Sequence, residues 1–307
     1  MKNRFFIGLS PFLQLILLAL ITVVSFFLFT LIGLIGAVVL YGIPFQDVLS
    51  SMNPSNPDNI GLLKFMQITQ SFGIFILPSL VVGWLATTNP FNYLGFRSTC
   101  TWAGFGIMLL VLLAIEPVVA YSGILNQNMS LPGFMTGLEE WMKDMETRAM
   151  ELTEAFLNVK TLSGLGVNLL MVAILPALGE ELFFRGVLQR ILTKWFKNVH
   201  VAVIVTSILF SALHMQFYGF IPRFILGMLF GYLYVWSGNL WYPVLAHLVH
   251  NTIPVIAYYL YASELSGTSV DDIGTGDNVW MWAIGGSILL IIFAKRFRER
   301  FREHKLE

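Results

Sequence analysis

Six polar side chains in otherwise apolar stretches of the sequence are of types that could carry out hydrolysis. A charged side chain at bilayer depth costs at least ~2.5–3.5 kcal/mol on insertion scales, so its default interpretation is functional. Carboxylates and imidazoles can exchange protons with a water molecule, and donor groups can hold a developing negative charge. The six candidate catalytic residues are Glu180, Glu181, Arg185, His214, His247 and Asn251.

The first motif contains two adjacent carboxylates that we expect to take different roles. Successive residues of an α-helix point about 100° apart, whereas residues four apart nearly overlay. Glu181 and Arg185 can therefore pair along one face, while Glu180 points towards the bundle interior or a water-filled cavity. An unpaired Glu180 is a candidate general base. The alternative is a buried ionic clamp without chemistry, but a surplus buried carboxylate is hard to explain structurally.

The two later motifs allow two mechanisms. His247 and Asn251 are four residues apart, so both face one side of a helix. Glu180, His214 and His247 could bind Zn²⁺ with a water as fourth ligand. Alternatively, Glu180 and His214 could activate water without a metal, while His247 and Asn251 donate hydrogen bonds to an oxyanion. The residues leave both open; the His-Glu-x-x-His zinc signature is absent from the sequence.

Several of these residues also have a purely structural interpretation. His214 ends its apolar segment and could be an interfacial group, and Asn251 could form an ordinary interhelical hydrogen bond. His250 lies one turn from His247, so spacing alone does not exclude it from a site. Glu116, in an earlier apolar segment, could line a polar cavity, but we interpret it as structural.

The elements that must position these residues are expected to be membrane-spanning helices. A spanning helix needs about 20 mostly apolar residues. The fifth apolar segment is short, so seven spans is the alternative to eight. The predicted fold is all-α, a polytopic membrane helix bundle of about eight transmembrane helices. The apolar segments are 12–41, 66–87, 102–122, 163–192, 199–214, 218–236, 240–262 and 278–295.

The placement of charged residues favours eight membrane spans over seven. Basic residues gather after the fourth segment and after the last, whereas the loops before those two segments are mainly acidic. By the positive-inside rule, this alternation places both termini in the cytoplasm. The last of these loops has no basic residue; its acidic residues are Glu264, Asp271, Asp272 and Asp277.

The same pattern divides the chain into four regions. We expect N-terminal transmembrane helices at 1–125, an extracytoplasmic segment at 126–160, a catalytic core at 161–295 and a basic cytoplasmic tail at 296–307. Within the second region, apolar residues from Trp141 to Phe156 recur at spacings of three and four, which predicts a helix. It is either an amphipathic helix on the outer membrane surface or a solvated connector packed on the bundle.

The composition defines the class of protein. Hydrophobic residues make up 56% of the chain and charged residues 12%, against about 25% charged in a typical soluble domain. The formal net charge of zero gives no reason to expect a nucleic-acid partner, and we expect membrane lipid and a peptide as partners. The single cysteine, Cys100, excludes an intrachain disulfide and a cysteine-rich metal site.

The three motifs in this order resemble those of a known family. Glu-Glu-x-x-x-Arg at 180–185, Phe-x-x-x-His at 210–214 and His-x-x-x-Asn at 247–251 look like the motifs of the CAAX-protease and bacteriocin-processing (CPBP, or Abi) family of intramembrane proteases. That family includes the type II CAAX prenyl endopeptidases.

The resemblance implies an eight-helix fold with a cavity open to membrane and cytosol. It implies that Glu180 and His214 activate water, and that His247 and Asn251 complete the site or stabilise the oxyanion. Family members have been described as metalloproteases and as glutamate proteases, so zinc stays open. The expected protein is an intramembrane endopeptidase of a bacterial cytoplasmic membrane, acting on membrane-associated or lipidated polypeptides.

Two other classes of function compete with the protease. A cation-coupled transporter would more often show repeated halves, and the sequence shows no duplication. A non-catalytic membrane scaffold, for example in bacteriocin self-immunity, would not need the complete set of candidate catalytic groups.

Overall fold

The described part of the chain, residues 5–53, 56–97, 100–265 and 278–303, folds into helices without a β-strand in this computed structural model. The all-α class is confirmed. The α-helices are α1 (Phe5–Gly8), α2 (Pro11–Tyr41), α3 (Ile60–Ser71), α4 (Leu77–Ala86), α5 (Pro90–Leu94), α6 (Trp102–Gln127), α7 (Thr136–Leu157), α8 (Leu162–Asn168), α9 (Leu175–Glu181), α10 (Gln189–Phe196), α11 (Val199–Ala212), α12 (Phe220–Ser237), α13 (Trp241–Leu265) and α14 (Val279–Glu303). Short 3₁₀-helices lie at Phe45–Asp47, Pro57–Asn59, Gly133–Met135 and Phe217–Gly219.

Two long rods contain π-helical turns. One such turn, Phe72–Ile76, joins α3 to α4; two others, Leu169–Ile174 and Leu182–Leu188, join α8, α9 and α10. A proline has no N–H for the carbonyl four residues earlier, so a helix deforms there. Pro176 deprives Val172, inside the second π turn, of its usual partner. The distortion at Pro176 takes the form of a widened turn.

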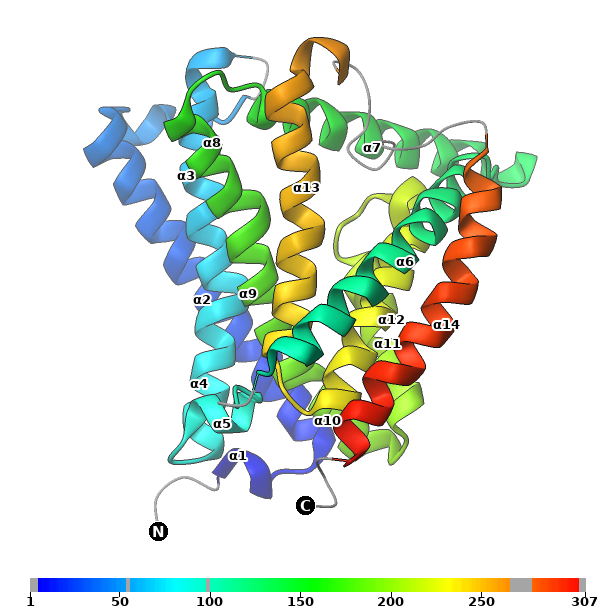
Figure 1. Cartoon of the computed structure of the whole chain (residues 1–307). Helices are drawn as coiled ribbons and strands as arrows, with labels where there is room; N and C mark the ends of the chain where they lie inside the picture. Colours follow the sequence, from blue (N-terminus) through cyan, green and yellow to red (C-terminus); the bar gives the residue numbers. More distant parts are fainter. Residues whose placement is uncertain (1–4, 54–55, 98–99, 266–277, 304–307) are drawn as a thin grey trace.

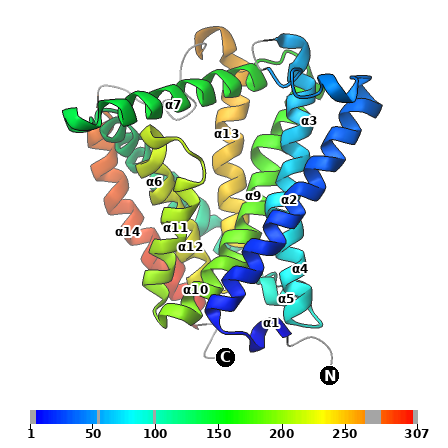
Figure 2. The ribbon, with the colours of Figure 1, turned by 180° about the vertical axis from the view of Figure 1, so that it is seen from behind.

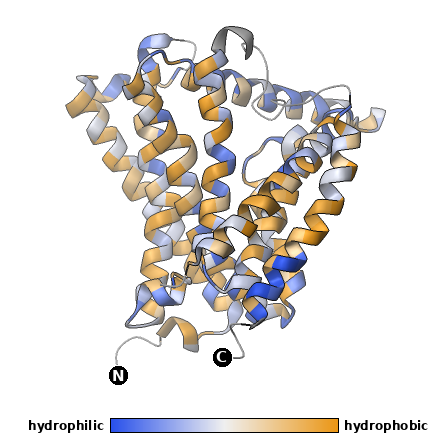
Figure 3. Ribbon diagram, in the orientation of Figure 1, coloured by the Kyte–Doolittle hydropathy of each residue, from blue (hydrophilic) through white to orange (hydrophobic). Residues whose placement is uncertain are grey.

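Six helical rods are long and apolar enough to cross a membrane, among the described residues. Val199–Ala212 is a shorter apolar helix of 14 residues, and α13 is not one of the six. All eight predicted segments are helical, but the number of crossings stays a prediction. Figure 3 shows apolar residues along the length of the bundle and hydrophilic residues gathered towards its ends.

The helices diverge from one end of the bundle to the other (Figures 1 and 2). The helix α1, the short α5 and the C-terminal end of α14 lie at the narrow end, and α7 lies across the wide end. The helix α13 stands in the middle and contacts α6, α9 and α12. Because α13 carries the third motif and contacts α9, where the first motif begins, this helix organises the candidate site. The side of the membrane on which each end lies stays a prediction.

The helix α7 confirms the helix predicted from the spacing of apolar residues between Trp141 and Phe156. Its first half is largely exposed, and Phe156 and Leu157 at its end are buried. Trp141 packs on Phe217 with ring centroids 5.3 Å apart, and Glu146 accepts a hydrogen bond from the backbone N–H of Tyr218 at 3.2 Å. The helix is thus attached to the loop after α11; whether it also lies on the outer membrane surface stays a prediction.

The expected basic tail begins inside a helix. The helix α14 continues through residue 296 to Glu303, and Phe297 and Phe301 are buried against Tyr242, with ring centroids 5.3 and 5.0 Å away. The basic residues there lie on the solvent side of a packed helix. Lys2, Arg4, Asp271, Asp272, Asp277 and the last four residues lie outside the described residues.

Candidate active site

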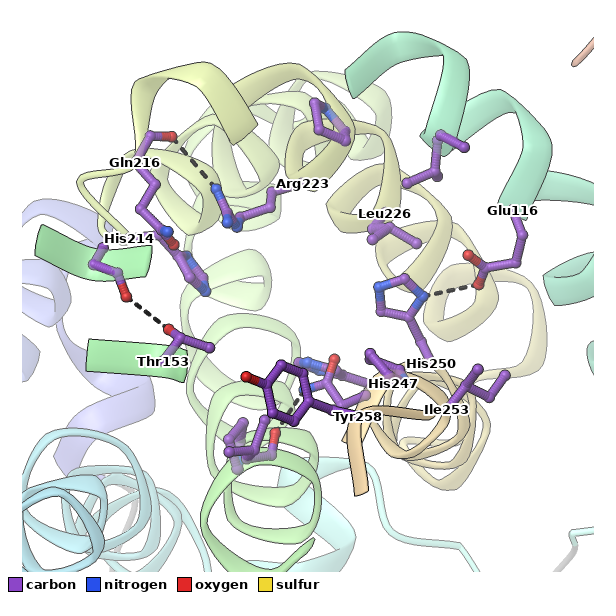
Figure 4. A pocket seen from close by; sticks show the side chains of 18 of the residues that line it. Glu116, Thr153, His214, Gln216, Arg223, Leu226, His247, His250, Ile253 and Tyr258 are labelled. Atoms are coloured by element: carbon purple, nitrogen blue, oxygen red, sulfur yellow. Dashed lines mark hydrogen bonds and ion pairs between the residues drawn. The ribbon is translucent and has the colours of Figure 1, made fainter. Parts of the chain in front are cut away.

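A cavity of about 710 Å³ lies inside the bundle, between α13 and the helices around it (Figure 4). Four of the six candidate residues line it: Glu180, His214, His247 and Asn251. Apolar side chains such as Phe210, Leu226 and Phe230 form much of the remaining wall, and α7 contributes residues from Ala149 to Phe156. The other two candidates, Glu181 and Arg185, are fully buried behind the wall.

Glu181, Arg185 and His247 form a buried ionic cluster, of which His247 also lines the cavity. Arg185 Nη1 donates to Glu181 Oε1 at 2.9 Å, and His247 Nδ1 lies 3.0 Å from the same oxygen. Arg185 Nη2 donates to the carbonyl of Gly227 on α12 at 2.9 Å. The predicted pairing along one helix face is therefore present, and it also holds the imidazole of a third motif residue.

Three phenylalanine rings surround the guanidinium of Arg185. Its Cζ lies 4.7 Å from the ring centroid of Phe210, 5.6 Å from that of Phe230 and 5.8 Å from that of Phe184. A cation facing aromatic rings is attracted by their quadrupoles, most strongly where water is excluded. Phe210 also packs edge-on against His214 at 5.1 Å. The phenylalanine of the second motif thus links the ionic cluster to the cavity histidine.

Glu180 is the carboxylate of the first motif that faces the cavity. Its Oε2 is buried and has no hydrogen-bond partner among the described residues. Glu181 Oε2 is also unpartnered there, but Glu181 Oε1 already serves Arg185 and His247. The preceding Gly179 lets α9 approach a neighbouring rod, since a Cβ there would lie 3.1 Å from the Cβ of Phe75. Close packing therefore sets the placement of Glu180.

His214 lies just beyond the end of α11. Its Nδ1 is 2.8 Å from the carbonyl oxygen of Phe210, so that nitrogen carries the hydrogen and Nε2 is the one able to accept a proton. Met215 follows in a left-handed conformation (φ 54°), which ends the helix and turns the chain away. The imidazole is thereby held at the mouth of the cavity, where it is exposed.

Asn251 lines the cavity but also braces two helices. Its Nδ2 donates to the carbonyl of Val172 at 3.0 Å, the same carbonyl that Pro176 leaves without a helical partner. The interhelical hydrogen bond expected for an asparagine at this depth is therefore present. One amide hydrogen and Oδ1 remain for a ligand in the cavity.

Three cavity residues were not among the candidates. His250 Nδ1 lies 2.8 Å from Glu116 Oε1, so the acid interpreted as structural is paired across the cavity wall with the histidine that spacing left open. Arg223 on α12 lines the opposite wall and donates to the carbonyl of Gln216 at 3.4 Å. The available signals were an acid and an arginine inside predicted spans, Glu116 and Arg223, and a histidine one turn from a motif histidine.

The proposed zinc ligands do not form a metal site in this arrangement. Within the described ranges, no three His, Cys, Asp or Glu side chains lie close enough together to hold a metal ion. The chemistry of the donors is nevertheless suitable, because His214 and His247 are each held through Nδ1 by an oxygen, as metal-binding imidazoles usually are. Zinc stays a prediction.

Comparisons with known proteins agree with the motifs. Residues 163–253 match the family model described as type II CAAX prenyl endopeptidase Rce1-like, and this segment contains all three motifs. The match confirms the resemblance seen in the sequence and points to a membrane-bound protease. It covers fewer than a third of the residues of the chain.

Two curated relatives come from Bacillus subtilis (strain 168). The chain is 31% identical over 90 residues to "Uncharacterized protein YpbD", covering 28% of this chain and 43% of that protein. It is 28% identical over 109 residues to "Putative membrane peptidase YdiL", covering 36% of this chain and 43% of that protein. The chain thus spans less than half the length of these relatives. No solved structure matches.

Proposed function

We propose that this protein is an endopeptidase of a bacterial cytoplasmic membrane that hydrolyses peptide bonds in membrane-associated or lipidated polypeptides. The observation that carries the proposal is the division of labour between two adjacent carboxylates. Glu181 is committed to Arg185 and His247, whereas Glu180 faces the cavity with an oxygen that no described residue hydrogen-bonds. The family match over the motif-bearing helices supports the same reaction.

In the proposed reaction, Glu180 is the general base. Its carboxylate takes a proton from a water molecule while the water oxygen attacks the carbonyl carbon of the scissile bond. The carbonyl electrons move onto oxygen, giving a tetrahedral intermediate. The C–N bond then breaks, and the proton held by Glu180 passes to the leaving nitrogen. His214, which lines the same cavity, orients the water through Nε2.

His247 and Asn251 are the proposed oxyanion donors. Glu181 accepts the Nδ1 hydrogen of His247, so this imidazole can donate from Nε2 only when both ring nitrogens carry hydrogens. Asn251 has one amide hydrogen beyond the one it gives to Val172. A buried donor directed at the developing charge is worth about 2.7–4 kcal/mol of the activation barrier.

The cavity sets the kind of substrate. Its volume of about 710 Å³ lies within the usual 300–1,000 Å³ of small-ligand sites, so it holds a short stretch of extended chain. Its walls are largely apolar, with Phe210, Leu226 and Phe230 beside the polar groups. Apolar side chains or a lipid chain on the substrate fit these walls.

The proposal is tested by mapping new peptide ends. Purified protein is incubated in H₂¹⁸O with a library of membrane proteins and apolar peptides, and new termini are identified by mass spectrometry. Hydrolysis would place one ¹⁸O in each new carboxyl terminus, and Glu180→Gln protein would produce none of these ends. If the parent made no new ends, or Glu180→Gln made the same ends at the same rate, the proposal would be wrong.

Metal content separates the two mechanisms. It is measured on protein that cleaves, and cleavage is repeated after strong chelation. The metal-free mechanism predicts no stoichiometric metal and unchanged cleavage. Stoichiometric zinc, with cleavage lost on chelation and restored by zinc, would transfer water activation to a metal held by Glu180, His214 and His247.

A further inference from the structure

The cavity contains a second carboxylate–imidazole pair that the proposed reaction does not use. His250 Nδ1 and Glu116 Oε1 are 2.8 Å apart, and the two residues come from α13 and α6. Both line the same cavity as Glu180. Figure 4 shows the imidazole of His250 between Glu116 and the open centre of the cavity.

The pair presents hydrogen-bond acceptors to the cavity. An ionised Glu116 can only accept, so Nδ1 of His250 carries the hydrogen between them and Nε2 of the neutral ring is an acceptor. The second carboxylate oxygen of Glu116 is another acceptor. Within the described part of the chain, neither of these two atoms bonds another protein group. A donor entering the cavity therefore finds two acceptors held in fixed relation.

A structural role alone does not account for the openness of this pair. The side chains of His250 and Glu116 are 25% and 32% exposed. Polar groups at bilayer depth are costly and usually mark a substrate or ion path. If this pair served only to join α6 and α13, we would expect neighbouring side chains to bury it, as they bury the Glu181–His247 pair.

The spacing along α13 relates this pair to the proposed reaction. His250 is three residues beyond His247, which is about 4.5 Å along a helix axis. An extended peptide advances about 3.3–3.6 Å per residue. A substrate that lies along α13 with its scissile carbonyl at His247 therefore places a residue one or two positions from that bond beside His250.

We infer that Glu116 and His250 form a substrate-binding subsite that receives a hydrogen-bond donor of the substrate one or two residues from the scissile bond. The inference rests on the proposed function for its register. A primary amide or an ammonium group has enough hydrogens to donate to both acceptors, and a hydroxyl can donate to one of them. An acidic side chain meets the Glu116 charge and is rejected, since like charges brought together cost free energy.

The subsite is tested by binding, so that cleavage is not needed. Glu180→Gln protein in detergent micelles is titrated with fluorescent apolar peptides in which one residue at a time is Lys, Asn or Asp. We expect the Lys or Asn peptide to bind about tenfold more tightly than the Asp peptide at one or two adjacent positions. When Glu116→Gln is combined with Glu180→Gln, the ratio of the affinities for the two kinds of peptide should fall close to one. Adding Glu140→Gln, an exposed carboxylate on α7, should leave it unchanged.

Two results would overturn the subsite: a selectivity ratio unaffected by Glu116→Gln, or an equal loss of affinity for every peptide. His250→Gln, which loses the imidazole acceptor, should also lower the ratio and serves if Glu116→Gln does not fold. Failure of the proposed function has a different signature. If the protein binds the peptides selectively but the parent cleaves none of them, the subsite proposal stands and the protease proposal is wrong.

Discussion

Two carboxylate–imidazole pairs lie one turn apart on α13, and they differ in their surroundings. In the first, the side chains of Glu181 and His247 are 0% and 5% exposed; in the second, those of Glu116 and His250 are 32% and 25% exposed. The first is completed by Arg185 and three phenylalanine rings. The second has a cavity on its free side.

The buried pair holds the fold together while its His247 lines the cavity as a proposed oxyanion donor, whereas the open pair offers acceptor atoms to a ligand. A buried charge without its partner is strongly unfavourable, so the buried pair is bound to its place. A partly exposed pair has a smaller desolvation cost and keeps acceptor atoms for a ligand. If this comparison is right, substitutions in the buried ionic cluster should destabilise the protein, and substitutions in the open pair should change what it binds.

The largest expected effect is in the buried ionic cluster. Arg185→Met leaves Glu181 fully buried without its cation, so we expect a loss of about 3–5 kcal/mol in the free energy of unfolding. The measurement is unfolding by SDS titration in mixed micelles. Arg296→Met, at an exposed arginine on α14, is the matched control. A loss for Arg185→Met below about 1 kcal/mol, the value usual for an exposed ion pair, would remove the basis of the comparison.

Loss of the Phe210 ring should have the second-largest effect on stability. Phe210→Ala removes a buried ring that contacts Arg185 and His214, and the expected cost is about 3 kcal/mol. Cleavage per folded molecule should also fall, because His214 loses a packing partner. Phe134→Ala, at a ring that is 87% exposed, should cost less than about 0.5 kcal/mol. Equal costs at the two sites would show that Phe210 does not support the cluster.

Loss of the hydrogen bond between Asn251 and Val172 should have the third-largest effect on stability. Asn251→Ala loses an interhelical hydrogen bond, worth about 0.6–1.7 kcal/mol in membrane proteins. Pro176→Ala restores the N–H that Val172 lacks, so Asn251→Ala should cost less in that background. A double-mutant cycle measures the coupling. A coupling of zero would show that Pro176 does not create the need for Asn251.

The smallest effect on stability is expected in the open pair. Glu116→Gln keeps the shape of the side chain and can still bond His250, so the cost should stay below about 1 kcal/mol. The same SDS titration measures it beside Arg185→Met. If Glu116→Gln cost as much as Arg185→Met, the two pairs would be equivalent and the open pair would be structural.

The spacing of residues along the sequence was sufficient to predict much of the fold and part of the site. The apolar segments predicted the helices, and the four-residue spacing of Glu181 and Arg185 predicted their bond. The boundary expected at 295/296 stays a prediction. The charges there did not indicate that Phe297 and Phe301, four residues apart, form one buried helix face.

Contacts between helices could not be predicted from one sequence. Glu116 and His250 are 134 residues apart, and Glu181 and His247 are 66 apart. Helical periodicity shows which face is apolar, but not which helix covers it. A proline in a helix leaves the carbonyl four residues earlier in need of a donor. Only the packing of α13 shows that Asn251 supplies it at Val172.

The most direct test compares the cavity carboxylate Glu180 with a surface carboxylate, Glu140, for chemistry and stability. Cleavage rate per folded molecule and free energy of unfolding are measured for Glu180→Gln and for the surface control Glu140→Gln. We predict that Glu180→Gln folds as stably as the parent and cleaves at least ~100-fold more slowly, while Glu140→Gln matches the parent in both. Parental cleavage by Glu180→Gln would contradict its assignment as the general base.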